Sequence, residues 1–204
     1  MNGTAVFRTL DHALAEGLLR EGDLLLFRGH GLLAAMIQIA GRSAYSHAGM
    51  AADWSGVPMA LEATAGGVAA VSVAERVRQY GARIDVFRAN PENRWPTFDR
   101  AGAVRWMLRM TGRRYGYRTL LRVALLHLPF ARLVIRPALD DRNGGAKPQP
   151  ETVEPICSEA VAMAYRLGGG VDPVLLLADR YTEPADLARS PFFEYTCTLT
   201  EDTT

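Results

Sequence analysis

Short hydrophobic runs bounded by turn residues dominate the first part of the chain. Residues 24–27 are all hydrophobic, and residues 83–88 alternate polar and apolar side chains. Both patterns are typical of β-strands, buried on both faces in the first case and on one face in the second. We therefore predict strands at residues 24–27, 45–52, 57–63, 68–71, 83–88 and 192–199.

Hydrophobic residues at helical spacing predict the helices. In the clearest case Ile156, Ala160 and Met163 recur on one face, and the run ends at Gly168-Gly169-Gly170. Pro155 suits the first helical position, because the N–H that proline lacks would have no partner there. Helices are predicted at residues 9–20, 32–40, 73–80 and 97–110, from residue 155 onward and from residue 182 onward.

Residues 45–52 and 57–63 are predicted to form a hairpin around the turn sequence Asp53-Trp54-Ser55-Gly56. If the turn is centred between Trp54 and Ser55, His47 lies directly opposite Glu62. One face of the hairpin is then a core face, and it carries Ala48, Met50, Ala52, Val57, Met59 and Leu61. Apart from His47 and Glu62 the other face is small, which leaves room for a helix to approach closely.

Composition narrows the class of protein. The chain has 204 residues, of which 49% are hydrophobic and 22% charged, and we predict a single domain, 1–204, with a helical or loop insertion at about residues 118–150. A net charge of +1 argues against a nucleic-acid binder. No secretory signal or membrane-spanning run is visible, so a cytoplasmic location is expected. The oligomeric state is left open.

Cys157 is the first candidate for chemistry. Its predicted place in the first turn of a helix puts it near the positive end of the helix dipole, which favours the nucleophilic thiolate. Taken alone, the residue is more simply explained as a small buried hydrophobe, as most free cysteines are. Cys197 is predicted to be inert, and neither cysteine belongs to a C-x-x-C motif.

His47 and Glu62 favour a catalytic role for Cys157 over a structural one, because they supply a base and an orienting group. A catalytic cysteine needs an imidazole, and the imidazole needs an acceptor that fixes its tautomer. We predict that Cys157, His47 and Glu62 form this set, and that the Cys157 N–H stabilises an oxyanion. Tyr45, Tyr115 and Ser158 are predicted to contact the substrate. A zinc site built from the three catalytic candidates is the alternative, but short-spacing chelate motifs are absent, so no metal or other cofactor is expected.

Residues 118–136 mix basic and apolar side chains without an acidic residue. The simpler interpretation is a pair of packed helices with solvated arginines. The alternative is a lid or surface for a substrate with an apolar tail and an acidic head, which would allow peripheral membrane contact.

Three short motifs, in this order, resemble a known family. They are Ser46-His47-Ala48-Gly49, Leu61-Glu62-Ala63 and Cys157-Ser158-Glu159. The order is similar to that of the permuted papain-like amidases of the YaeF/YiiX group, relatives of the NlpC-type peptidases and of lecithin retinol acyltransferase, in which the histidine precedes the cysteine. Gly22-Asp23-Leu24 and the stretch 182–187 also match, but residues 118–150 do not match closely.

The resemblance implies an α+β, circularly permuted papain-like fold, with an antiparallel sheet packed against the helix that carries the cysteine. It also implies that Cys157 is the nucleophile, His47 the base and Glu62 the third member. The expected activity is a thiol amidase or peptidase acting on a peptidoglycan-type peptide or an N-acyl amino acid. An acyltransferase, a lipid deacylase and a non-catalytic binding module on the same fold remain alternatives.

Overall fold

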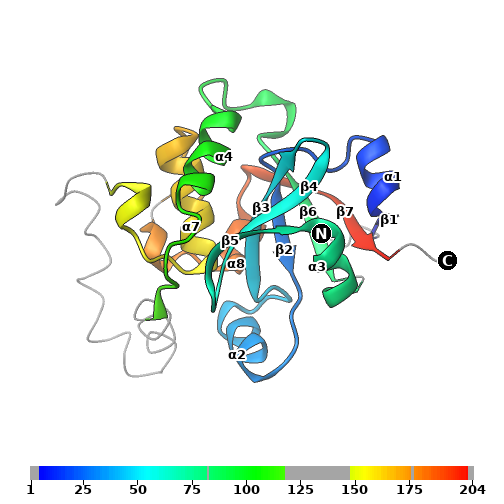
Figure 1. Ribbon diagram of the computed structural model, residues 1–204, viewed down its shortest axis with the longest axis horizontal. Helices are drawn as coiled ribbons and strands as arrows, with labels where there is room; N and C mark the ends of the chain where they lie inside the picture. The colour runs from blue at the N-terminus through cyan, green and yellow to red at the C-terminus, as the bar shows by residue number, and fades with distance from the viewer. Residues whose placement is uncertain (1–4, 82, 118–147, 176, 202–204) are drawn as a thin grey trace.

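The computed structural model describes residues 5–81, 83–117, 148–175 and 177–201. Within them a seven-stranded sheet has the order β1-β7-β6-β2-β3-β4-β5 (Figure 1). All neighbouring strands are antiparallel except β1 and β7, which are parallel. The strands are β1 Phe7–Thr9, β2 Leu24–Phe27, β3 His47–Trp54, β4 Val57–Thr64, β5 Gly67–Ser72, β6 Ile84–Ala89 and β7 Phe193–Thr200.

Helices cover both faces of the sheet. In Figure 1, α4 and α7 lie on one side of the strands, α1 and α3 lie on the other, and α2 lies at one end. The helices are α1 Leu10–Ala15, α2 Leu32–Gly41, α3 Val73–Tyr80, α4 Arg100–Arg109, α7 Cys157–Met163 and α8 Pro184–Arg189. A π-helical turn, Ala164–Gly168, continues α7, and short 3-10 turns occupy Pro91–Asn93, Pro150–Thr152 and Asp179–Tyr181.

Two hydrophobic cores follow from this layering. Leu24 and Leu26 of β2 pack with residues of α4 and α7, whereas Leu25 and Phe27 pack with residues of α1 and α3. Successive strand residues point to opposite faces, so a strand buried on both faces is hydrophobic throughout. This explains why the run 24–27 contains no polar residue.

The β3–β4 hairpin differs in register from the prediction. A two-residue turn at Ser55-Gly56 pairs Trp54 with Val57 and Gly49 with Glu62, so the predicted pairing of His47 with Glu62 is wrong by two residues. Ser55 and Gly56 have φ values of +55° and +85°, the left-handed backbone that tight hairpin turns require. A shift of two keeps every side chain on its predicted face, and the small face is covered by α3.

Helix α7 begins at Cys157, two residues later than the predicted start at Pro155. Ile156 is its N-cap residue, and the Ile156 N–H donates to the Glu159 carboxylate at 3.2 Å. The nucleophile candidate is therefore the first residue of the helix, where backbone N–H groups lack intrahelical acceptors.

A fully buried carboxylate, Asp23, joins three parts of the fold. It pairs with Arg88 of β6 and Arg100 of α4, each at 2.9 Å, and accepts the Ala89 N–H at 3.2 Å. Gly22 precedes it with φ of +74°, and the Gly22 carbonyl accepts the Tyr165 hydroxyl at 2.9 Å. The Gly22-Asp23-Leu24 motif thus ties the start of β2 to strand β6 and to the helical layer that contains α4 and the π-helical turn.

The predicted insertion falls almost entirely on residues 118–147, which lie outside the described residues, as do the two helices and the lid predicted there. None of the helices in the described part of the chain has the length and hydrophobicity needed to cross a bilayer.

Candidate active site

Cys157, His47 and Glu62 lie together at one end of the sheet. His47 is the first residue of β3, Glu62 lies in β4, and Cys157 begins α7, which packs against both strands. The His47 Nε2 contacts the Glu62 Oε2, and the Cys157 side chain lies close enough to the His47 ring for each group to shift the pKa of the other. Because Nε2 faces Glu62, Nδ1 is the nitrogen left for the sulfur. The imidazole thus bridges the thiol and the carboxylate.

The absence of a side chain at Gly49 allows His47 and Glu62 to meet. Gly49 lies directly opposite Glu62, and His47 lies two residues before it on the same face. A Cβ at position 49 would be 3.1 Å from the Leu61 carbonyl oxygen and 3.4 Å from the Glu62 Cβ. Without that atom, the Glu62 side chain is free to lean diagonally across the strand pair toward the imidazole.

The Cys157 thiol has a lowered pKa despite its burial. Burial raises the pKa, but the charge of His47, its hydrogen bond and the backbone N–H groups of Ala48 and Ser158 all lower it. The last two contacts come from the start of β3 and the first turn of α7. A negatively charged sulfur is therefore stabilised by both elements that meet at the site.

His47 shows the complementary shift. Burial lowers the pKa of its imidazole, but the interactions with Cys157 and Glu62 outweigh burial and raise the pKa to about 10. The thiol pKa is lowered and the imidazole pKa is raised because each group stabilises the charged form of the other.

Glu62 is held as a carboxylate by a fourth residue, Arg76 of α3. Burial raises the pKa of Glu62, but the interactions with His47 and Arg76 together outweigh burial, so the pKa is lowered overall. The Arg76 Nε donates to the Glu62 Oε1, and the Arg76 Nη1 donates to the Gln79 Oε1. Both carboxylate oxygens are thus engaged, although only 1% of the Glu62 side chain is exposed.

Arg76 is a site residue that was not predicted from the sequence. It lies on a short helix with charged residues on several sides, and such residues are usually solvated. Only its tertiary neighbour Glu62 distinguishes it from Arg78, whose guanidinium pairs with Glu75 at the surface. The local sequence contains no signal that would have identified it.

A cavity of about 550 Å³ opens beside the sulfur, and we call it the Cys157 cavity. Cys157, His47, Glu62 and Arg76 all reach it. Much of the remaining wall is apolar or aromatic and includes Leu33, Ile37, Tyr80, Tyr115 and Tyr117. Such a wall suits a substrate with an apolar or aromatic portion.

The three predicted substrate-contacting residues lie in different surroundings. Tyr115 lines the Cys157 cavity, and burial together with the negative charge of Cys157 raises the pKa of its phenol. The Tyr45 hydroxyl donates to Asp85 at 2.8 Å, and the Ser158 hydroxyl donates to the Thr182 carbonyl at 2.6 Å. Neither Tyr45 nor Ser158 lines the Cys157 cavity.

Comparison with known proteins identifies the fold. No family model and no curated protein sequence matches the chain. The crystal structure titled metalloprotein YiiX from Escherichia coli O157:H7 matches with a TM-score of 0.60 at 14% identity, over 89% of this chain and 98% of that one. The predicted resemblance to the YaeF/YiiX group and the predicted α+β permuted papain-like fold are thereby confirmed at the level of fold.

YiiX is described as a metalloprotein, but Cys157, His47 and Glu62 of this chain are poorly placed for a metal ion. Among the described residues there is no group of three or more His, Cys, Asp and Glu side chains placed to hold one. Moreover, both Glu62 oxygens are engaged, one by His47 and the other by the cationic Arg76. A metal ion would have to displace these contacts beside a fixed positive charge, so the site does not fit one.

Proposed function

We propose that the protein is a cysteine-dependent hydrolase that cleaves a small amide through a thioester acyl-enzyme. The observation that carries the proposal is the pairing of Cys157, whose thiol pKa is lowered, with His47, whose imidazole pKa is raised, at the wall of a cavity. The proposed substrates are peptidoglycan-type peptides and N-acyl amino acids, since the cavity can enclose a small amide with an apolar group.

Acylation begins when the Cys157 thiolate attacks the carbonyl carbon of the amide and a carbon–sulfur bond forms. The carbonyl oxygen becomes negative, and the Cys157 N–H at the start of α7 is available to donate to it. The imidazolium of His47 then gives its proton to the amide nitrogen as the carbon–nitrogen bond breaks. The amine leaves, and a thioester remains on Cys157.

Deacylation uses the same residues in reverse. Neutral His47 takes a proton from water while the water oxygen adds to the thioester carbon. The carbon–sulfur bond breaks, the thiolate departs, and the acid is released. His47 is again an imidazolium, so the resting ion pair is restored. A second nucleophile in place of water would give acyl transfer.

Glu62 orients this proton transfer, and Arg76 holds Glu62. The carboxylate fixes the imidazole through Nε2 and stabilises its charged form, as the third member of a Ser-His-Asp triad does. The guanidinium keeps the buried carboxylate ionised. Arg76 is thus a positioning residue that acts through Glu62.

Hydrolysis of a panel of N-acyl amino acids and short peptides, followed by amine release, tests the proposal. Cys157→Ala should abolish turnover, whereas Cys197→Ala, which removes the other buried cysteine, should leave it unchanged. Mass spectrometry of the wild type, quenched in acid during turnover, should show the mass of an acyl adduct on the intact protein, and peptide mapping should place it on the peptide that contains residue 157. Turnover that survives in Cys157→Ala would refute the mechanism.

A further inference from the structure

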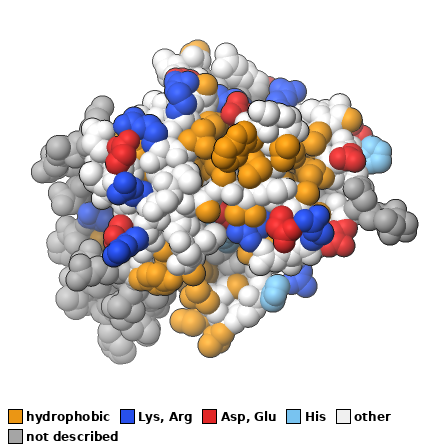
Figure 2. All heavy atoms as spheres, in the orientation of Figure 1, with side chains coloured by type: hydrophobic (Ala, Val, Ile, Leu, Met, Phe, Trp, Pro, Cys, Tyr) orange, Lys and Arg blue, Asp and Glu red, His pale blue; other side chains and the backbone are white. Residues whose placement is uncertain are grey.

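Helix α2 turns its apolar side outward. Leu32 is 81% exposed and Ile39 is 78% exposed, and Leu33 and Met36 are also exposed. Leu32, Met36 and Ile39 recur at i, i+4 and i+7, which places them on one face of the helix. Figure 2 shows hydrophobic side chains at the end of the molecule where Figure 1 places α2.

The polar residue of α2 points the other way. Gln38 donates from its side-chain nitrogen to the carbonyls of Gly29 at 3.0 Å and Ala44 at 2.9 Å. A surface helix normally buries its apolar face and solvates its polar residues. The reversed arrangement of α2 presents an apolar surface, and contiguous surfaces of this kind mark interaction sites.

The charge around α2 identifies the kind of partner. No acidic residue occurs from Leu24 to Ala52, and exposed His30 and Arg42 stand near the two ends of the helix. From the neighbouring α8, Glu183 lies close to Gly41, and Arg189 donates to the Gly41 and Arg42 carbonyls. These two residues carry opposite charges, so the surroundings of α2 stay basic.

The outer surface of α2 is continuous with the Cys157 cavity. Leu33 is exposed and also lines the cavity, together with Ala34 and Ile37 of the same helix. An acyl chain lying along α2 would therefore meet an apolar path from the outside of the protein to the sulfur.

We propose that α2 is a docking surface for an anionic lipid bilayer. Its aliphatic side chains enter the boundary between headgroups and acyl chains, while Arg42 and His30 face the acidic headgroups. A second copy of this chain fits less well, because α2 carries no acidic side chain that could pair with the Arg42 of the other copy. This last step rests on the proposed hydrolase function: the same surface would bring amides that carry an acyl chain to Cys157.

Co-sedimentation with vesicles tests the docking surface. The full-length protein should bind phosphatidylcholine vesicles that contain about one third phosphatidylglycerol. The double variant Leu32→Ser, Ile39→Ser should bind at least about tenfold more weakly, because it removes the two most exposed apolar side chains of the helix. The matched control, Trp54→Ser with Val57→Ser, removes exposed apolar side chains from the β3–β4 turn and should bind like the wild type.

Two further arms test the charge. Binding should weaken with added salt and on vesicles of phosphatidylcholine alone, and Arg42→Gln should reduce it, whereas Arg78→Gln on α3 should not. Absence of wild-type binding, or equal loss in the control variant, would overturn the proposal. A double variant that changes the oligomeric mass in solution and leaves vesicle binding intact would show instead that α2 is an interface between copies.

Docking and catalysis can fail separately. Cys157→Ala should bind vesicles as the wild type does, because the sulfur is not part of the docking surface. Vesicle binding without amide turnover would therefore refute the proposed function alone, and turnover without vesicle binding would refute the docking surface alone.

Discussion

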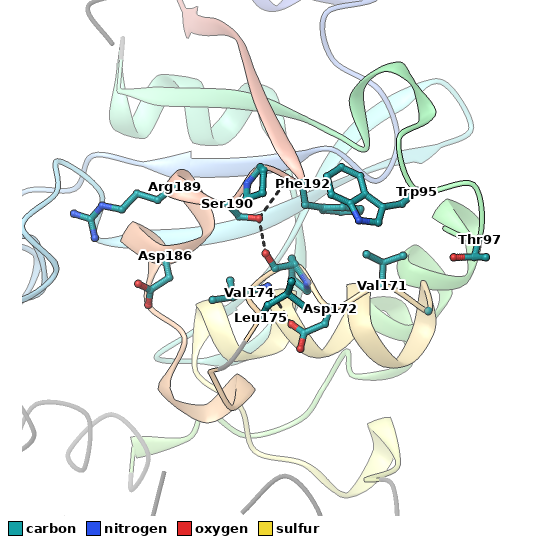
Figure 3. Close-up of a pocket in the computed structure, with 13 residues that line it drawn as sticks. Trp95, Thr97, Val171, Asp172, Val174, Leu175, Asp186, Arg189, Ser190 and Phe192 are labelled. Carbon is teal, nitrogen blue, oxygen red and sulfur yellow. Dashed lines mark hydrogen bonds between the residues drawn. The ribbon is translucent and has the colours of Figure 1, made fainter. Parts of the chain in front are cut away.

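Two cavities of nearly equal size differ in what their polar side chains do. The Cys157 cavity has a volume of about 550 Å³, and a second one, the Ser190 cavity, has about 570 Å³. The Ser190 cavity lies between the loop that carries Trp95, the segment from Val171 to Leu175 and the end of α8 (Figure 3). Volume alone does not distinguish them.

Polar groups of the Ser190 cavity hold the local backbone. The Ser190 hydroxyl donates to the Pro173 carbonyl and accepts the Phe192 N–H, as the dashed lines in Figure 3 show. Asp172 accepts the Val174 N–H at 3.0 Å, and Asp186 accepts the Glu183 N–H at 2.9 Å. These bonds fix turns and a helix start, which is a structural use of the side chains.

In the Cys157 cavity the polar groups instead bond to one another, side chain to side chain. The chain from Arg76 through Glu62 and His47 to Cys157 separates charge within a poorly solvated space. Neighbouring groups with shifted pKa values identify a candidate active site better than the volume of a cavity does. Substitutions in the two cavities should therefore differ in their effect on turnover.

The largest expected effect follows from His47→Gln, which removes the ion-pair partner of the thiolate. We expect kcat/KM for the amide substrate to fall by about 10³-fold, within the range typical of general acid–base residues. Ser190→Ala, the matching change in the second cavity, should leave kcat/KM unchanged. Steady-state kinetics on both variants would contradict the comparison if the two losses were similar.

The pH dependence of alkylation should separate the two cysteines. Cys157, with a lowered pKa, should react with iodoacetamide well below the ordinary thiol range, and amide turnover should decline above about pH 10, where His47 loses its proton. Burial raises the pKa of Cys197, so this thiol should stay unmodified at neutral pH. Peptide mapping after timed labelling measures both rates, and equal labelling of the two cysteines at pH 6 would contradict the assignment.

Arg76→Gln should have an intermediate effect. It leaves the buried Glu62 carboxylate without its guanidinium, so the Glu62 pKa should rise and the acidic limb of the activity profile should move to higher pH. We expect about tenfold lower activity at neutral pH, and about 3 kcal/mol lower free energy of unfolding.

The control for Arg76 is Arg78→Gln on the same helix, which breaks only a surface pair and should change neither quantity. Arg76→Lys should recover part of the activity, because it restores the charge but not the planar donor group. A drop in stability with an unchanged pH profile would make Arg76 a purely structural residue.

The smallest effect on activity is expected for Ser190→Ala. Removing this buried hydroxyl leaves the Pro173 carbonyl and the Phe192 N–H without their partner, which should lower the free energy of unfolding by about 1–2 kcal/mol. Turnover should stay within about twofold of the wild type. Urea unfolding and amide kinetics check the two statements, and a large loss of turnover would show that the second cavity serves the reaction.

The hydrophobic pattern predicted most strands and helices of the described chain, because most of them are buried on a regular set of positions; α2, whose apolar face is exposed, is an exception. It missed β1, whose three residues Phe7–Thr9 carry little periodic signal and pair with the distant β7. The hairpin register failed because the φ values of Ser55 and Gly56 decide where the chain turns, and several turns suit the same four residues.

The placement of polar side chains was predictable only where the proposed chemistry demanded a partner. Cys157, His47 and Glu62 were brought together by the logic of a nucleophile, a base and an acceptor, and the structure places them in contact. Tyr45 and Ser158 had no such logic, and their hydroxyls bond to Asp85 and the Thr182 carbonyl. The sequence does not show which polar groups a folded backbone leaves in need of a partner.

The placement of Arg76 also bears on how the chain is made. Glu62 and Arg76 leave the ribosome close together, whereas Cys157 follows Glu62 by roughly 95 residues, which takes about 5–20 s at ordinary rates of translation. During that interval Arg76 is already available to pair with Glu62, so a nascent hairpin can fold without leaving this carboxylate unpaired. Cys157 is the last of the four site residues to be synthesised, so the ion pair of Glu62 and Arg76 can be in place before the reactive thiol exists.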